Sequence, residues 1–286
     1  MTTIRHAFEA LGAFIAYAIF ALLPIDWASG FGGWIGRTIG PALPMSRIAR
    51  ANLRAVFPDM PEAERERTLR EMWDMVGRIV GEYPHLDAIA RGAGTLGARV
   101  EVAGAEQVEM LKGRGAALLF SAHLGNWEVF APSLAALGVP YAQVYRDPNN
   151  PFVSWLIHRV RRLPREEMVP KGPAGARQAI AILSKGGRLG MLVDQKLNDG
   201  IAVPFFGRDA MTAPALARFA QRYDCPAVPV RLERLGGAHF RVSFEAPLDT
   251  SGTDAEVMAR ANRIIEGWIR ARPAQWLWIH RRWPAG

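Results

Sequence analysis

A histidine, an asparagine and a glutamate follow directly on the apolar run GAALLF (115–120), in the string SAHLGNWEVF (121–130). A buried strand has no use for such residues, whereas an imidazole beside a carboxylate can act as a general base. His123 and Glu128 are five residues apart, about 140° on a continuous helix, so on one helix they would not share a face. They can meet if His123 lies in the loop and Glu128 in the first helical turn, with Asn126 as the N-cap. We then expect Glu128 to orient the ring and leave its other nitrogen free as a base.

This pair is also compatible with an ordinary surface hydrogen bond at a strand end. If it is catalytic, the sequence favours one chemistry, because no G-x-S-x-G nucleophile elbow occurs in the chain. The base would then deprotonate an acceptor hydroxyl that attacks an activated acyl carbon. The helix N-terminus that follows would place N–H donors near the developing oxyanion.

Arginines gather in a second cluster, which comprises YRDPNNP (145–151) and HRVRR (158–162). Guanidinium groups bind phosphate and carboxylate in a bidentate manner, so Arg146 and Arg161 are candidate substrate-binding residues. A solvated basic face is the alternative for each of them.

The third cluster lies in VDQKLNDGIAVPFFG (193–207), where Asp194 and Gln195 end an apolar run. Asp194 is expected at a strand tip, either paired with an arginine of the second cluster or as a simple turn residue. Arg208 follows the aromatic pair of this segment, which suits the wall of an apolar channel or a closed core. We include Asp194, Gln195 and Arg208, together with Asn126 of the first cluster, among the candidate substrate-binding residues.

Short apolar runs alternate with helical patterns after residue 95, which predicts an α/β domain. In such sheets ligands bind beyond the carboxyl ends of strands, where all three clusters fall. The expected strands are 98–104, 116–122, 140–146, 187–195, 226–234 and 239–247, and the expected helices are 128–138, 151–162, 174–187, 213–224 and about 254–272. Residues 45–95 are expected to be a helical lead-in to this domain, which we place at 45–286.

The first 44 residues are expected to form a membrane anchor and interfacial segment. Ala10 to Ile25 carries no charged residue, and Trp27 and Trp34 follow it as interfacial aromatics. The alternatives are a signal peptide, which the lack of a clean cleavage site weakens, and a buried core helix. The pattern leaves open whether the segment spans the membrane or lies in its interface. Arginines downstream favour a cytoplasmic position for the rest of the chain.

The composition of the 286-residue chain narrows the class of partner. A formal net charge of +8 suits an anionic lipid, an acidic substrate or nucleic acid. We expect no nucleic-acid binding, because no such motif occurs and the N-terminus is apolar. The single cysteine, Cys225, cannot form an internal disulfide, which favours a reducing compartment. No metal site is expected.

Taken in order, these strings resemble the bacterial late acyltransferases of lipid A biosynthesis, which belong to the lysophospholipid acyltransferase superfamily. His123 and Glu128 match its H-x4-D/E motif within HLGNWE, and the similarity covers nearly the whole chain. The other strings that carry it are ANLRAVFP (51–58), YR and NP of 145–151, DQ (194–195), VPFFG (203–207) with Thr212, VPV (228–230) and PAQWLWIHRRW (273–283).

The resemblance implies a mixed sheet flanked by helices, and transfer of an acyl chain from acyl carrier protein to a hydroxyl of an acylated, phosphorylated glucosamine lipid. It implies His123 as the base with Glu128 as its partner, a substrate arginine that maps best onto Arg161, and no cofactor besides the acyl carrier protein. The partners it implies are this carrier protein, an anionic lipid and the bacterial inner membrane, with the catalytic domain on the cytoplasmic side. The family's YRP reads YRDP here, so Asp147 alters the loop after Arg146.

A non-catalytic lipid-binding protein and an acyltransferase acting on another lysolipid or glycolipid remain the competing hypotheses.

Overall fold

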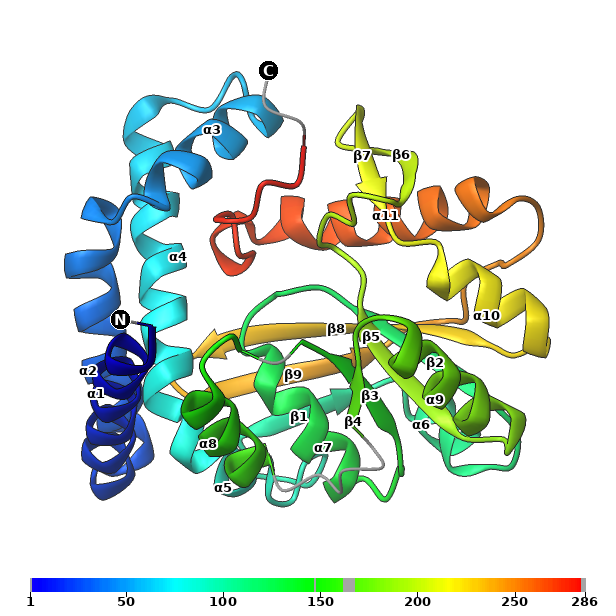
Figure 1. The fold of residues 1–286 in the computed structure, drawn as a ribbon, viewed down its shortest axis with the longest axis horizontal. Coiled ribbons are helices and arrows are strands. Elements are labelled where there is room, and N and C mark those ends of the chain that lie inside the picture. Colours follow the sequence, from blue (N-terminus) through cyan, green and yellow to red (C-terminus); the bar gives the residue numbers. More distant parts are fainter. Residues whose placement is uncertain (1, 147, 162–167, 284–286) are drawn as a thin grey trace.

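A mixed sheet at the centre of the protein carries the segments that were expected to be strands (Figure 1). The computed structural model describes residues 2–146, 148–161 and 168–283. Within them the seven-stranded sheet has the order β1-β9-β8-β2-β5-β3-β4. Its strands are β1 (Val100–Ala103), β2 (Ala117–Ser121), β3 (Ala142–Tyr145), β4 (Met168–Pro170), β5 (Arg188–Leu192), β8 (Ala227–Gly236) and β9 (His239–Phe244).

The central strand β2 is parallel to both of its neighbours, β5 and β8. β3 is parallel to β5 and β4, whereas β9 is antiparallel to β8. The carboxyl ends of β2, β5, β3 and β4 therefore lie side by side at one edge of the sheet. Polar residues that follow these four strands are brought together there.

Helices cover both faces of the sheet, and β2 is buried on both sides as a result. Leu118 and Phe120 pack into a core with α3, α4 and α9 to α11, whereas Ala117 and Leu119 pack into a second core with α5 to α7. The flanking helices are α6 (Ala105–Lys112), α7 (Phe130–Ala136), α8 (Pro151–Arg161), α9 (Pro173–Ser184), α10 (Ala215–Tyr223) and α11 (Asp254–Ala271), with 3-10 turns η3 (Trp127–Val129) and η5 (Pro273–Gln275).

The chain before the sheet is helical, as expected for residues 45–95. Its elements are α1 (Thr2–Leu22), α2 (Ile25–Ile39), η1 (Gly40–Ala42), α3 (Ser46–Val56), α4 (Glu62–Glu82), η2 (Tyr83–His85) and α5 (Leu86–Ala90). α2 lies directly against α4, because glycines face each other where the two helices cross. A Cβ atom on Gly77 of α4 would lie 2.1 Å from the carbonyl oxygen of Gly32, and one on Gly36 would lie 2.0 Å from that of Trp73.

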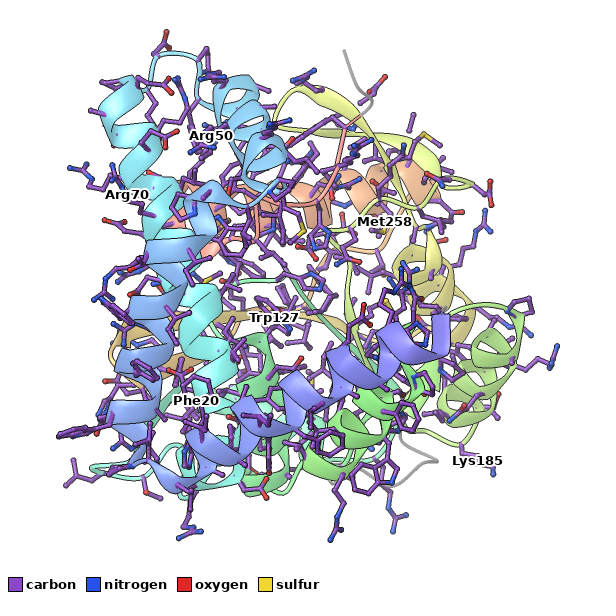
Figure 2. The ribbon with its side chains drawn as sticks, turned by 60° about the vertical axis from the view of Figure 1, so that its left-hand side comes forward. Phe20, Arg50, Arg70, Trp127, Lys185 and Met258 are labelled. Carbon is purple, nitrogen blue, oxygen red and sulfur yellow. The ribbon has the colours of Figure 1, made fainter. Side chains whose placement is uncertain are left out.

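α1 lies along the surface of the protein, as the turned view in Figure 2 shows. Asn150 donates a hydrogen bond to the carbonyl oxygen of His6 near one end of the helix (2.8 Å), and His85 contacts that of Phe20 near the other end (2.9 Å). Between them Phe14 packs against Trp155 of α8. The residues Arg5–Leu22 are the one segment in the described part of the chain that is long and apolar enough to cross a membrane.

Three short strands were not predicted. β4 has only three residues, and β6 (Ile201–Phe205) and β7 (Arg208–Thr212) form an antiparallel hairpin outside the main sheet. The expected helix at 128–138 begins as a 3-10 turn and continues as α7.

Candidate active site

His123 lies in the loop after β2, where a buried aspartate holds it. Its Nδ1 atom is 2.8 Å from Oδ1 of Asp194, and its backbone N–H donates to Oδ2 of the same carboxylate (3.0 Å). The register of the sheet accounts for this contact, because Ser121 at the end of β2 pairs with Leu192 at the end of β5. His123 and Asp194 each lie two positions beyond that pair.

Asp194 is held as an anion. It is almost completely buried, and Trp276 donates a third hydrogen bond to it from Nε1 (2.8 Å). Burial alone would raise the pKa of this carboxyl, but its electrostatic interaction with His123 and the hydrogen bonds from His123 and Trp276 outweigh it, so the pKa lies well below its usual value. An ionised carboxylate only accepts hydrogen bonds, so Nδ1 of His123 carries the proton. This leaves Nε2 as the basic atom of a neutral ring.

Nε2 of His123 points at Gln195, the residue after Asp194. The amide nitrogen of Gln195 is 3.1 Å from Nε2 of His123 and 3.0 Å from Nε2 of His280. An amide nitrogen can only donate, so both ring nitrogens accept and both rings are neutral. Burial lowers the pKa of His280 to about 4, which agrees with a neutral ring.

The carboxylate of Glu128 does not hold His123, contrary to expectation. Both residues are described, and no hydrogen bond joins them; Glu128 Oε1 accepts from Nε1 of Trp127 instead (3.1 Å). Trp127 lies edge-on to the His123 ring. Glu128 nevertheless lines the same cavity as His123. The pairing of β2 with β5 places Asp194 next to the His123 ring. The five-residue spacing between His123 and Glu128 could not indicate this contact.

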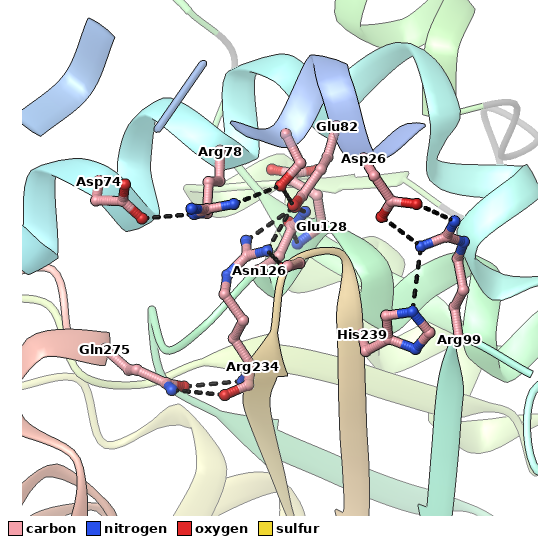
Figure 3. Close-up of polar contacts among 12 residues, drawn as sticks. Asp26, Asp74, Arg78, Glu82, Arg99, Asn126, Glu128, Arg234, His239 and Gln275 are labelled. Carbon is pink, nitrogen blue, oxygen red and sulfur yellow. Dashed lines mark hydrogen bonds and ion pairs between the residues drawn. The ribbon is translucent and has the colours of Figure 1, made fainter. Parts of the chain in front are cut away.

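Asn126 is the N-cap, as predicted, since its Oδ1 accepts from the backbone N–H of Glu128 (3.1 Å). It is fully buried, however, and does not line the cavity, so its prediction as a substrate-binding residue is wrong. Its Nδ2 donates to Oε2 of Glu82 (2.7 Å), a carboxylate that is itself fully buried (Figure 3). Arg234 and Ser29 also donate to Glu82. Asn126 therefore positions the turn that carries Glu128.

The C-terminal tail fixes the loop of His123 from the other side. Gly125 donates to the carbonyl oxygen of Gln275 (2.9 Å), and the N–H of Leu277 donates to that of His123 (3.1 Å). The side chain of Gln275 in turn makes two hydrogen bonds to the backbone of Arg234 (Figure 3). These contacts give PAQWLWIHRRW a structural role.

The candidate arginines lie in different places. Arg146, which follows β3, lines the cavity of His123. Arg161 ends α8, but its side chain is outside the described part of the structure, as are Asp147 and Arg162. Arg159 lines a separate polar cavity with Tyr17 and Tyr83. Arg208 begins β7, where its guanidinium lies 6.0 Å from the Trp283 ring; it is exposed and does not line the His123 cavity.

Two cavities meet at this edge of the sheet. The catalytic cavity has a volume of about 300 Å³ and is lined by polar groups, among them His123, Glu128 and His280. The second has about 240 Å³ and an apolar lining, which includes Ala179, Met191 and Phe219. Four residues line both cavities, namely Val144, Lys171, Leu192 and Gln195. Across the described ranges no group of three or more His, Cys, Asp or Glu residues is placed to hold a metal ion.

Sequence reasoning missed four residues of this site: Lys171, Glu82, Trp276 and His280. The tail string had singled out Trp276 and His280 but gave them no role. Lys171 follows a strand too short to recognise, and Glu82 lies within a long amphipathic helix.

A histidine held by a buried carboxylate, in a polar cavity that shares four lining residues with an apolar one, suits an α/β enzyme that moves an apolar group to a hydroxyl. Comparison with known proteins agrees with this class. The family model of the bacterial lipid A biosynthesis acyltransferases matches residues 2–285. The chain therefore belongs to this family and is an acyltransferase of lipid A biosynthesis.

Three relatives illustrate the similarity. A lipid A biosynthesis acyltransferase of Haemophilus influenzae is 28% identical over 264 residues, which is 87% of this chain and 81% of the relative. The lipid A biosynthesis myristoyltransferase of Escherichia coli is 26% identical, over 92% of this chain and 83% of its own length. The lipid A biosynthesis lauroyltransferase of the same organism is 27% identical, over 83% of this chain and 78% of its own length.

Proposed function

We propose that the protein transfers a fatty acyl chain from acyl carrier protein to a hydroxyl of an acylated, phosphorylated glucosamine lipid, the lipid A precursor. The observation that carries this proposal is the His123–Asp194 pair beside an apolar cavity. The relatives named above are lipid A acyltransferases, which supports the same substrate class.

His123 is the general base of this mechanism. Its Nε2 takes the proton of the acceptor hydroxyl, whose oxygen bonds to the thioester carbon. The carbonyl oxygen becomes an oxyanion, and Asp194 stabilises the imidazolium. The tetrahedral intermediate then collapses, the carbon–sulfur bond breaks, and the departing thiolate takes the proton from Nε2. Gln195 occupies Nε2 before substrate binds, so its amide moves aside for the hydroxyl.

Glu128 and Arg146 share the cavity with the base and are proposed to contact substrate. A carboxylate at Glu128 suits a hydroxyl or amide of the sugar, whereas Arg146 suits a phosphate. We also keep Arg161 as a proposed substrate residue from the family resemblance. The apolar cavity is proposed to hold the acyl chain.

Residues 1–44 are proposed to associate with the inner membrane, with the acyltransferase domain, 45–286, on the cytoplasmic side. α1 exposes a row of apolar side chains, Leu11, Ile15, Ile19 and Leu22, as a helix facing lipid does. Its contacts with the protein at both ends favour a helix that lies in the interface rather than one that spans. The net charge of +8 suits both anionic lipid and an acidic carrier protein.

The test is acyl transfer by the purified full chain from acyl carrier protein to lipid A precursor, followed by mass spectrometry of the lipid. His123→Ala should abolish transfer while the protein stays folded and membrane-associated. His239→Ala is the matched control, because His239 is exposed on β9, away from the catalytic cavity, and should retain activity. Full activity of His123→Ala would exclude the base assignment.

Lipid mass spectrometry of a deletion strain and its complemented strain identifies the acceptor and the acyl chain. A change confined to another lysolipid or glycolipid would replace the lipid A precursor as the substrate. Lipid binding by the wild-type chain without any acylated product would instead favour a non-catalytic lipid-binding protein.

A further inference from the structure

Lys171 occupies a place in the site that neither the sequence pattern nor the family motifs assign. β3 and β4 are neighbouring parallel strands, and Tyr145 pairs with Pro170 at their ends. Arg146 and Lys171 are the next residues along the two strands, and the N–H of Lys171 donates to the carbonyl oxygen of Tyr145 (3.1 Å). Two cations therefore end adjacent strands, beside the end of β5 that carries Asp194.

Lys171 lies where the two cavities join. It is the one cationic residue among the four that line both of them. Arg146 lines only the catalytic cavity, and Lys196 lines only the apolar one. Gln195, the other polar residue at the junction, is bonded to His123 and His280.

The charge of Lys171 is available to a ligand. In the described part of the chain, its ammonium group has no hydrogen-bond or ion-pair partner. Partial burial and the positive charge of Arg146 lower the pKa of Lys171, and the carboxylate of Asp194 opposes this only in part. A positive charge that no ion pair neutralises favours an anion at this point, although the carboxylate of Glu128 lines the same cavity.

The reaction develops an anion at the same point. If the acyl chain fills the apolar cavity and the reacting carbon lies beside Nε2 of His123, the thioester lies at the junction. Its carbonyl oxygen becomes negative when the acceptor hydroxyl adds to the carbon. We propose that Lys171 is a catalytic residue whose ammonium group stabilises this oxyanion, an assignment that rests on the proposed acyl transfer.

In this step the hydroxyl oxygen forms a bond to the carbonyl carbon and its proton moves to His123 Nε2. The carbonyl π electrons move to the oxygen beside Lys171. On collapse they return, the carbon–sulfur bond breaks, and the thiolate takes the proton from His123. Lys171 keeps its own protons throughout, so its contribution is electrostatic and depends on charge.

The experiment measures kcat and KM for both substrates in Lys171→Met, Lys171→Arg and the control Lys185→Met. Lys185 lies at the other end of α9, is exposed and lines neither cavity. Removing a group that stabilises an oxyanion lowers kcat by about 10²-fold. We expect this loss for Lys171→Met with little change in either KM, a partial recovery for Lys171→Arg, and wild-type values for Lys185→Met.

Thermal melting of each variant separates loss of folding from loss of catalysis. An unchanged kcat in Lys171→Met would overturn the assignment. An unchanged kcat with a raised KM for the phosphorylated acceptor would also overturn it, since Lys171 would then bind a phosphate. A wild-type chain that transfers no acyl group would overturn the proposed function itself, and the assignment of Lys171 with it.

Discussion

The buried carboxylate of Glu82 is predicted to be the main electrostatic support of the catalytic turn. It accepts four hydrogen bonds, two from Arg234 (2.5 and 2.8 Å), one from Ser29 (2.6 Å) and one from Asn126 (2.7 Å). These donors come from α2, β8 and the turn after β2 (Figure 3). Glu82→Gln keeps the size of the side chain but removes the charge and half of its acceptor capacity.

The expected cost follows from this geometry. At least two charge-assisted hydrogen bonds are lost, each worth about 1.5–3 kcal/mol, and the guanidinium of Arg234 stays buried without a counter-ion. Removing one partner of a buried ion pair costs about 3–5 kcal/mol, which agrees with the combined cost of the two lost hydrogen bonds. For a chain of this length we expect the melting temperature to fall by roughly 2 °C per kcal/mol, or about 6–10 °C in all.

The assay is thermal unfolding of the detergent-solubilised full chain, monitored by tryptophan fluorescence. Glu101→Gln is the matched control, because Glu101 forms an ion pair of similar length with Arg241 across β1 and β9 (2.7 Å). Its side chain is 55% exposed and that of Arg241 is 44% exposed. Exposed pairs contribute at most about 1 kcal/mol. Equal shifts in the two variants, or a shift below about 2 °C for Glu82→Gln, would refute the reasoning.

Three further predictions concern the site. Asp194→Asn should lower kcat by about 10³- to 10⁴-fold in the acyl-transfer assay, because a neutral amide does not stabilise the imidazolium; a kcat within 10-fold of wild type would exclude the role. Ala179→Leu should shift the transferred acyl chain toward shorter lengths in mass spectra, since Ala179 lines the apolar cavity, whereas Ala181→Leu on the exposed side of α9 should leave the chain unchanged. The pKa of His280 is about 4 in the folded protein, whereas its ordinary value is 6.5. The unfolded chain therefore binds the proton more readily, and the free energy of unfolding falls by about 3 kcal/mol as the pH drops from 6.5 to 4. Denaturant titrations at several pH values should show this dependence, and His280→Gln should remove it.

Strand positions were readable from the sequence because their apolar runs end sharply. Residues 116–122 were expected as a strand, and β2 spans Ala117–Ser121 with all its side chains buried. The expected strand at 187–195 ends at Leu192, which leaves Asp194 in the loop, as a residue at a strand tip should be. β4 could not be read in this way, since three residues show no periodicity.

The partner of His123 could not be read from the sequence. Local spacing points to Glu128, five residues away, whereas the actual partner, Asp194, is 71 residues away. Only the pairing of β2 with β5 brings the two together, and the order of strands in a sheet is a property of the whole fold. Asn126 shows the same limit: its capping role was local and was predicted, but its contact with Glu82 depends on where α4 packs.

The order of strands also sets the order of charges across the site. β2 presents His123, the proposed base, β5 presents the carboxylate that holds it, and β3 and β4 present the two cations, because these four strands are neighbours and parallel. Asp194 therefore holds Nδ1 of His123, and Arg146 and Lys171 line the same cavity as the His123 ring. In the proposed mechanism, proton transfer to Nε2 places a positive charge beside Asp194, and the oxyanion forms toward Lys171. In the proposed mechanism, the sheet thus opposes each charge that forms during transfer with a fixed charge of the other sign.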